Sequence, residues 1–280
     1  MSLNFKLLII TLIAAAVFVS GCSEKTDSHG SFEIAVTNSY LGCAVDDICV
    51  KSRNVFCLAP PGMCPGHFDI SPSQIESLCR CRLFLFFDFQ KNIGRSVARM
   101  KENGPRAVSI RSPLGFCVPQ SYIQLCREVC SVLKNHYPEK KNIFEKRLKL
   151  IEKRLATLAD DLQGRIASAG LAGETVLASA HQARFAEWLG LDVVATFKRT
   201  DSETASHIQS CLEQAQGKDI RFIITNKQEG SRLGEALGQR LNAGIVVFSN
   251  FPGTEQSIPA FDKLLKDNLE SLIKAAENER

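Results

Sequence analysis

Three side chains of types that bind transition metals follow predicted strands in this sequence. His67 lies in the loop "PPGMCPGHFDI" at 60–70, Cys117 lies in "SPLGFCVPQSYIQLC", and His181 directly follows the run "TVLASA". Two neutral imidazoles and a thiolate form a ligand set that suits tetrahedral Zn²⁺ and also the softer Cu⁺. A lone histidine at a strand end is more often a hydrogen-bonding residue, and Cys117 alone would suit a disulfide. The prediction of a metal site therefore depends on all three residues meeting at one edge of the fold.

The elements that must position these residues are two groups of short, continuously apolar runs separated by helical segments. Apolar strands connected through helices are typical of parallel sheets that are covered on both faces. We therefore predict an α/β fold of two lobes, each a four-stranded, mainly parallel sheet flanked by helices. Ligands of such folds bind at the carboxyl ends of the strands. The predicted strands are 32–38, 54–60, 82–89 and 107–110 in the first lobe and 175–180, 192–197, 220–226 and 244–249 in the second.

A long amphipathic helix separates the two groups of strands. Apolar residues recur at three-and-four spacing from Ile143 to Ile166, and Pro138 stands near the start of the pattern, where proline is tolerated. A helix from Pro138 to Ala169 would be about 48 Å long at 1.5 Å per residue. We interpret its many lysines and arginines as a solvated face rather than as a patch that binds a membrane surface. The helix is expected to act as a rigid spine that joins the lobes.

The first residues of the sequence indicate export. Residues 1–22 contain one early lysine, an apolar run too short to span a bilayer comfortably, and the ending "SGC". Small residues directly before a cysteine resemble a bacterial lipobox, in which Cys22 would carry lipid; an ordinary cleaved signal peptide is the alternative. The polar residues 23–31 suit a flexible tether. The predicted organisation is a lipoprotein signal peptide 1–22, a tether 23–31, an N-terminal lobe 32–137, a linking helix 138–169 and a C-terminal lobe 170–280.

The charge balance argues against nucleic-acid binding, and the cysteine content predicts disulfides. The 34 lysines and arginines nearly balance 30 acidic residues, so the net charge of +4 gives no support to nucleic-acid binding. Of the 11 cysteines, all but Cys22 and Cys211 lie between residues 43 and 130. In an exported chain such density predicts disulfides, and setting Cys117 aside as a ligand leaves an even number of cysteines in that region. Cys126 and Cys130, four apart on a predicted helix, should face one packed side together.

Taken in order, these segments resemble the metal-binding solute receptors of ABC importers, the zinc- and manganese-type (TroA-like) periplasmic binding proteins. The stretch "EIAVTN" looks like the opening strand of that family, and the loop around His67 resembles its "P-x-G-x-D-P-H" loop, which carries the first metal histidine. The segment "SAHQARFAEWLGLDVV" is similar to the family segment that carries the third ligand, here His181. The stretches "IRFIITNKQEGSRLGEALGQRLNAGIVVF" and "FDKLLKDNLESLIKA" resemble its last strands and C-terminal helix, so the likeness covers nearly all of 32–276.

The resemblance implies a lipid-anchored, extracytoplasmic solute-binding protein, located in the periplasm or at the cell surface. Such a protein would capture a transition metal ion between two lobes, with Zn²⁺ ranked first, and deliver it to an ABC permease in the cytoplasmic membrane. We expect a monomer that is attached to the membrane through lipid and does not bind nucleic acid. No GxSxG, Walker or Rossmann pattern stands at a strand–helix junction of the sequence, so we expect no enzymatic activity.

The sequence departs from the family pattern at two ligand positions. Cys117 stands where the family has its second histidine, and the chain reads Ser249-Asn250-Phe251 where the family usually has an aspartate after the last strand. Asp69, Cys64 and Asn250 are the candidates for a fourth ligand or for a group that supports the ligands. Without a carboxylate the site should disfavour Mn²⁺, whereas Cys64 beside His67 would favour Cu⁺.

Three other functions stay open at this point. A metallohydrolase would use the open coordination position to activate water, but the sequence nominates no general base beside the metal. A thiol-redox lipoprotein would need an exposed pair of thiols with a low pKa. A degenerate receptor, altered at Cys117 and Asn250, would bind another metal such as Cu⁺ or Mn²⁺, or none.

Overall fold

The computed structural model describes residues 33–49, 55–59, 70–100, 104–199, 204–253 and 259–278, all of which belong to one unit of the chain, Ser31–Arg280. Among these residues no helix is both long and apolar enough to cross a membrane. The predictions made for Cys22, Cys64, His67 and Asp69 concern positions outside the described residues.

The first sheet contains four parallel strands in the order β2-β1-β3-β4. The central strand β3 reads LFLFF and is buried along its whole length, as expected of a strand covered on both faces. It pairs with β1, where Ala35 lies opposite Phe84, and with β4, where Ser109 lies opposite Phe86. The strands are β1 Ile34–Val36, β2 Val55–Cys57, β3 Leu83–Phe87 and β4 Arg106–Ile110.

Helices and a short 3₁₀ turn connect the strands of this first lobe. Helix α3 begins with a capping box, in which Ser71 Oγ accepts from the backbone N–H of Gln74 and the Gln74 side chain accepts from the N–H of Ser71. Helix α4 packs closely on the sheet, because a Cβ atom added at Gly94 would lie 2.3 Å from the ring of Phe86. The connecting elements are α2 Ser39–Cys49, α3 Pro72–Cys79, the 3₁₀ turn η1 Asp88–Gln90 and α4 Lys91–Ala98.

The second sheet repeats the arrangement in the order β6-β5-β7-β8, again with four parallel strands. Strand β7 is fully buried between β5 and β8. The strands are β5 Thr175–Ser179, β6 Asp192–Phe197, β7 Phe222–Asn226 and β8 Gly244–Phe248, and the helices of this second lobe are α7 Ala183–Trp188, α8 Ala205–Ala215 and α9 Arg232–Leu241. The two sheets confirm the predicted α/β fold.

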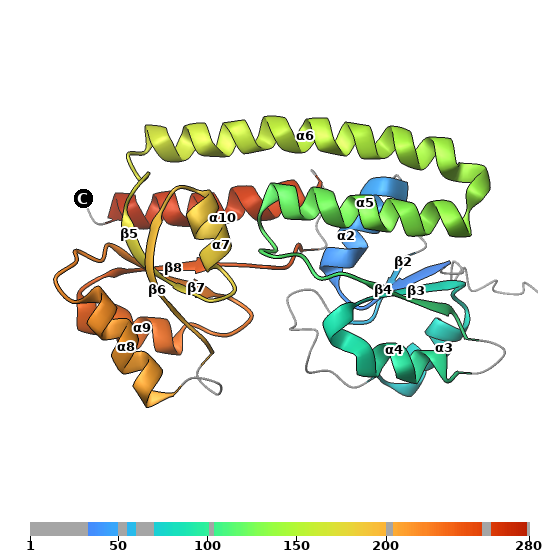
Figure 1. The fold of residues 1–280 in the computed structure, drawn as a ribbon, viewed down its shortest axis with the longest axis horizontal. Coiled ribbons are helices and arrows are strands. Elements are labelled where there is room, and N and C mark those ends of the chain that lie inside the picture. The colour runs from blue at the N-terminus through green and yellow to red at the C-terminus, as the bar shows by residue number, and fades with distance from the viewer. Residues whose placement is uncertain are drawn as a thin grey trace, which may run out of the picture. The chain divides into compact units, whose positions relative to one another are not determined.

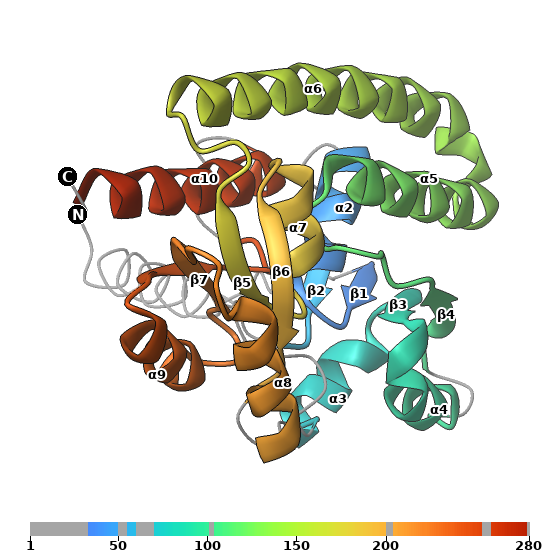
Figure 2. The ribbon, with the colours of Figure 1, turned by 60° about the vertical axis from the view of Figure 1, so that its left-hand side comes forward.

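A spine of long helices runs along both lobes. In Figures 1 and 2, α6 extends past both sheets, while α5 lies beside it over the first lobe and α10 over the second. The face of α6 that is buried carries apolar residues at three-and-four spacing, namely Phe144, Ile151, Leu155, Leu158, Leu162 and Ile166. Residues 138–140, which the sequence pattern places in the same helix, form a separate 3₁₀ turn before α6. The bounds are α5 Pro119–His136, the 3₁₀ turn η2 Pro138–Lys140, α6 Lys141–Ser168 and α10 Ala260–Asn278.

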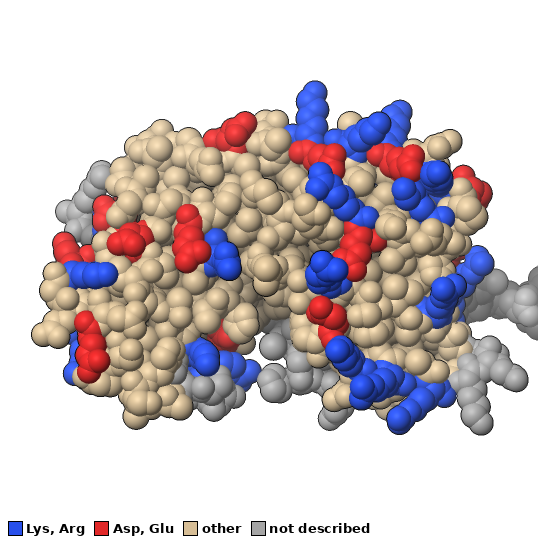
Figure 3. Space-filling model, in the orientation of Figure 1, with Lys and Arg blue, Asp and Glu red and all other residues tan. Residues whose placement is uncertain are grey.

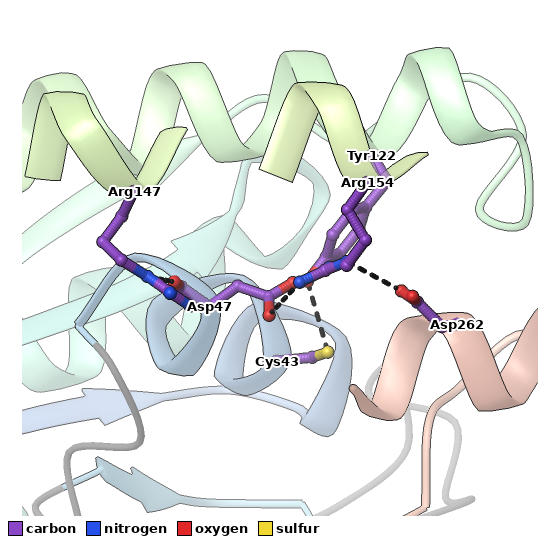
Figure 4. A network of polar contacts seen from close by, with 6 residues as sticks. All are labelled: Cys43, Asp47, Tyr122, Arg147, Arg154 and Asp262. Atoms are coloured by element: carbon purple, nitrogen blue, oxygen red, sulfur yellow. Dashed lines mark hydrogen bonds and ion pairs between the residues drawn. The ribbon is translucent and has the colours of Figure 1, made fainter. Parts of the chain in front are cut away.

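Side chains from both lobes meet beneath this spine in an ion-pair network (Figure 4). Arg154 of α6 donates to Asp47 of α2 at 3.1 Å to Oδ1 and 2.7 Å to Oδ2. The same guanidinium places its Nε 3.2 Å from Oδ1 of Asp262 on α10. Tyr122 donates its hydroxyl to Asp47 at 2.9 Å and stacks its ring on Phe261 of α10, with centroids 3.8 Å apart. One arginine therefore links the spine helix to one helix from each lobe.

The solvent side of the spine carries ion pairs of a different kind. Lys134 pairs with Glu145 at 2.9 Å and Arg127 pairs with Glu152 at 2.8 Å, in both cases between α5 and α6. Figure 3 shows Lys and Arg side chains interspersed with Asp and Glu at the upper right of the view, where α5 and the beginning of α6 lie in Figure 1. These pairs join the two helices at the surface, where water screens them.

The disulfides predicted for the first lobe are not present among its described cysteines, which corrects that expectation. Cys126 and Cys130 are buried on the core side of α5, as their spacing predicts, and Cys43 packs in the same core. The thiol of Cys57 donates to the carbonyl of Ala59 at 3.1 Å. These thiols act as small apolar groups with a weak donor, which suits a core without any cross-link. The described first-lobe cysteines, none of which forms a disulfide, are Cys43, Cys49, Cys57, Cys79, Cys81, Cys117, Cys126 and Cys130.

Candidate metal centre

The candidate site lies where the strands of the second sheet end. His181 follows β5, the turn 226–230 follows β7, and Ser249 and Asn250 follow β8. Because β5, β7 and β8 are parallel neighbours, their carboxyl ends meet at one edge of the sheet. The loop after β4 reaches this edge from the first lobe, and the thiol of Cys117 donates to the carbonyl of Ser249 at 3.1 Å. The candidate site is thus made by both lobes.

The imidazole of His181 is held by a carboxylate. Its Nδ1 lies 2.6 Å from Oε1 of Glu229, and the hydroxyl of Ser179 donates to Oε2 of the same carboxylate at 2.6 Å. The side chain of His181 is 62% exposed, whereas that of Glu229 is only 9% exposed. The hydrogen bond with Glu229 raises the pKa of His181 above its usual 6.5, against the opposing effect of burial. Burial alone would raise the pKa of Glu229, but hydrogen bonds from His181 and Ser179 outweigh it and lower that pKa, so the carboxylate is ionised.

A tight turn after β7 places Glu229 over the end of β5. The N–H of Glu229 donates to the carbonyl of Asn226 at 2.9 Å, and the N–H of Gln228 donates to Asn226 Oδ1 at 3.2 Å. Gly230 closes the turn with φ at 83°, a conformation that residues with a Cβ rarely adopt. The Gln228 side chain accepts from the N–H of Asn250 at 3.0 Å and donates to Ser249 Oγ at 3.0 Å. The one turn therefore positions side chains against both β5 and β8.

Cys117 is buried at the contact between the lobes. Its side chain is 1% exposed, and besides the bond to Ser249 its sulfur accepts from Asn268 Nδ2 of α10 at 3.5 Å. Burial raises the pKa of this thiol well above its ordinary value, so the group is a neutral thiol. A metal ion that uses this sulfur would have to displace the proton, as metals do with coordinating thiols.

The side chain of Asn250 lies next to two other predicted site residues, the thiol of Cys117 and the backbone carbonyl of His181. The side chain of Asn250 is buried, with Oδ1 3.7 Å from the sulfur of Cys117 and Nδ2 3.5 Å from the carbonyl of His181. Within the described ranges, no group of three or more His, Cys, Asp or Glu side chains is arranged to hold a metal ion. His67, Cys64 and Asp69 belong to the loop that lies outside those ranges.

Sequence reasoning missed Glu229 as a member of this site. Its contact with His181 joins residues 48 positions apart, and the pairing of β5 with β7 creates it. A signal for it was present, because "NKQEG" places a carboxylate and a turn glycine directly after the buried strand FIITN. A strand-end carboxylate beside a strand-end histidine is the pattern that would have identified it.

The chain is similar to proteins of known fold. A periplasmic metal-binding protein from Candidatus Liberibacter asiaticus, solved in a Mn-bound form, has a TM-score of 0.72 and 13% identity, covering 86% of this chain and 98% of that chain. The Cd-bound form of the protein from the same organism gives the same values. A crystal structure of ZnuA has a TM-score of 0.69 and 14% identity, covering 87% of this chain and 98% of that chain. These likenesses confirm the two-lobe, TroA-like fold, and no match to a curated protein was found.

The sequence also matches a protein family. The match covers residues 115–275, which is more than half of the 280 residues, and includes Cys117, His181, Glu229 and Asn250. The family is described as zinc-uptake complex component A, periplasmic, and its members are solute-binding proteins of transporters rather than enzymes. The chain therefore belongs to the zinc-uptake complex component A family, the metal-binding periplasmic components of transporters.

Proposed function

We propose that this protein captures Zn²⁺ between its two lobes and delivers the ion to the permease of an ABC importer. The observation that supports the proposal is the position of Asn250 at the contact between the lobes, where its side chain lies beside the sulfur of Cys117 and the backbone carbonyl of His181. Cys117 comes from the first lobe and the other two residues from the second. The affinity for an ion bound here would therefore depend on the relative position of the lobes.

The proposed ligands are His67, Cys117 and His181. Two imidazoles and a thiolate leave one position of a tetrahedral Zn²⁺ shell for water or for a nearby side chain, with Asp69 and Asn250 as candidates. The set contains no carboxylate, which favours Zn²⁺ over Mn²⁺, and its sulfur makes Cu⁺ the main competitor. Cys117 can take part only after its thiol has lost its proton and left the carbonyl of Ser249.

The proposed cellular setting follows from the sequence and the family. We infer a monomer that is exported and anchored through lipid on Cys22, with a tether at 23–31 and lobes at 32–137 and 170–280 on either side of the linking helix 138–169. The long spine and the ion pairs of Arg154 to both lobes oppose wide opening. Release of the ion would then use loop movement or a small tilt of the lobes.

A role in thiol redox chemistry is less well supported. Burial raises the pKa of Cys43 and of Cys57 to about 12, and that of Cys49 and of Cys81 to about 11. Thiols that stay protonated at neutral pH are poor nucleophiles. These four thiols therefore lack the low pKa that a redox carrier needs.

Metal titration of the purified, reduced protein tests the proposed function. Competition against a chelator should show tighter binding of Zn²⁺ than of Mn²⁺, and His181→Ala should weaken Zn²⁺ binding by orders of magnitude, because it removes a ligand from an incomplete shell. Cys117→Ser should weaken Zn²⁺ and reduce the affinity for Cu⁺ further. His207→Ala, on α8 of the same lobe, is the matched control and should leave binding unchanged. Equal Zn²⁺ affinities of the wild type and the His181 variant would refute the proposal.

A further inference from the structure

We propose that Glu229 is a positioning residue that holds the ring of His181 with Nε2 directed to the metal ion. The inference rests on the proposed function, since it assigns a role toward an ion that His181 would bind. Glu229 is not one of the proposed ligands, so its role is separate from the ligand assignment.

The geometry at His181 determines which ring nitrogen is available. A carboxylate can only accept, so the contact of 2.6 Å between His181 Nδ1 and Glu229 Oε1 requires the proton to be on Nδ1. In the neutral ring Nε2 then carries a lone pair, which is the form that binds a metal. Metal-bound histidines commonly donate their other ring N–H to a carboxylate in this way. The side chain of His181 is 62% exposed, so the ring is not enclosed by the protein.

Both oxygens of Glu229 are engaged, which is why we assign it orientation rather than direct metal binding. Oε1 faces His181, and Oε2 accepts from the hydroxyl of Ser179, the last residue of β5. Ser179 is also buried, so the carboxylate is held on a rigid strand end. A move of Glu229 toward a metal ion would break one of these two short hydrogen bonds.

The backbone that carries Glu229 is held in a tight turn. The turn is closed by the N–H of Glu229 to Asn226, by an isolated bridge between Asn226 and Gly230, and by the left-handed conformation of Gly230. Gln228 ties the same turn to the segment Ser249–Asn250. The turn and the two hydrogen bonds of the carboxylate therefore restrain Glu229 in the absence of an ion, which lowers the ordering cost of metal binding.

The test uses two variants of Glu229 and one matched control in the full-length mature protein. Glu229→Gln keeps the shape of the side chain and removes its charge, whereas Glu229→Ala removes the acceptor altogether. Glu235→Gln is the control, because Glu235 is an exposed glutamate that also hydrogen-bonds a serine, Ser231, but lies on α9 outside the site. Zn²⁺ affinity is measured by chelator competition. Nitrogen NMR of the metal-free protein, at a pH where the ring is neutral, reports the tautomer of His181.

Both readouts have a definite expected result. The wild-type ring should carry its proton on Nδ1, and Glu229→Ala should give a mixture of the two tautomers. Both Glu229 variants should bind Zn²⁺ about 10–100-fold more weakly, the usual effect of losing a carboxylate partner of a metal-bound histidine. Glu235→Gln should change neither readout. Unchanged Zn²⁺ affinity in the Glu229 variants, or weaker affinity with an unchanged tautomer in Glu229→Ala, would overturn the proposal.

The two measurements also separate this proposal from the proposed function. If the wild type and His181→Ala bind Zn²⁺ equally, the proposed function fails, and with it the role of Glu229 toward the metal. The tautomer measurement would still show in that case whether Glu229 orients the ring. If His181→Ala loses binding and the Glu229 variants keep it, only the positioning role is wrong.

Discussion

Replacing Arg154 with methionine should destabilise the protein more than the loss of any surface ion pair. The side chains of Asp47 and Asp262 are 10% and 11% exposed, and Arg154 itself is 24% exposed. The variant would leave two nearly buried carboxylates without their shared cation, although Tyr122 still donates to Asp47. Breaking a buried pair by removing one partner costs about 3–5 kcal/mol.

The loss should depend on pH in a defined direction. Burial raises the pKa of Asp262 above its usual 3.8, even though Arg154 opposes this shift. Removal of Arg154 would raise that pKa further, and a carboxyl with a raised pKa in the folded state weakens folding as pH rises through that value. The deficit of Arg154→Met should therefore be largest at neutral pH and should shrink as the pH falls toward 3.8.

Thermal unfolding followed by circular dichroism measures this effect. For a chain of this size about 3–5 kcal/mol corresponds to roughly 6–20 °C in Tm. Arg127→Met is the matched control, because it removes an arginine between α5 and α6 whose side chain is 49% exposed and whose partner Glu152 is 34% exposed. Its effect should stay below about 1 kcal/mol. Equal Tm values for the two variants, or a deficit in Arg154→Met that grows on acidification, would refute the reasoning.

Two further predictions concern the thiols and the glycines. Denatured but unreduced protein should be alkylated at all the described first-lobe cysteines, as read by mass spectrometry. In the native protein the exposed Cys79 should react first and the buried thiols slowly. Labelling of only a few cysteines after denaturation would support the disulfide prediction instead. Gly234→Ala should cost about 1–3 kcal/mol in urea unfolding, since the added Cβ would lie 2.1 Å from Thr225 Cγ2. Gly164→Ala, with open space within α6, should instead add about 0.5–1 kcal/mol, and a loss there would contradict the argument.

The sheets were predictable because their strands are continuous apolar runs. LFLFF and FIITN are buried at every position and could not be mistaken for half-exposed strands. The end of β3 was not predictable, because the predicted strand RLFLFFDF continues to Phe89 and only Asp88 interrupts its apolar residues. There the side chain of Gln90 accepts from the N–H of Phe87 and from the hydroxyl of Thr37, and the chain turns into η1. Phe89, which the sequence pattern includes in the strand, is consequently 54% exposed.

The placement of His181 and Asn250 at strand ends was predictable, but the partners of their side chains were not. His181 and Asn250 stand at strand ends, and the edge of a parallel sheet brings such residues together whatever their partners. The partners depend on contacts between distant segments, such as Glu229 with His181 and Cys117 with Ser249 across 132 positions. The disulfide prediction was wrong for the described first-lobe cysteines for a related reason: cysteine density indicates an oxidising compartment, but it contains no information on whether each thiol faces another thiol or the core.

The candidate ligands of the two lobes differ in orientation and protonation. In the second lobe, His181 is already oriented by an ionised carboxylate, so an ion that binds there meets a prepared ligand. In the first lobe, Cys117 is a protonated, buried thiol whose hydrogen bond to Ser249 helps to hold the lobes together. An ion that recruits this sulfur must release a proton and replace a contact between the lobes with a bond to metal. If the proposed ligand set is correct, capture at His181 would come first, and binding to Cys117 would then couple the ion to the arrangement of the lobes.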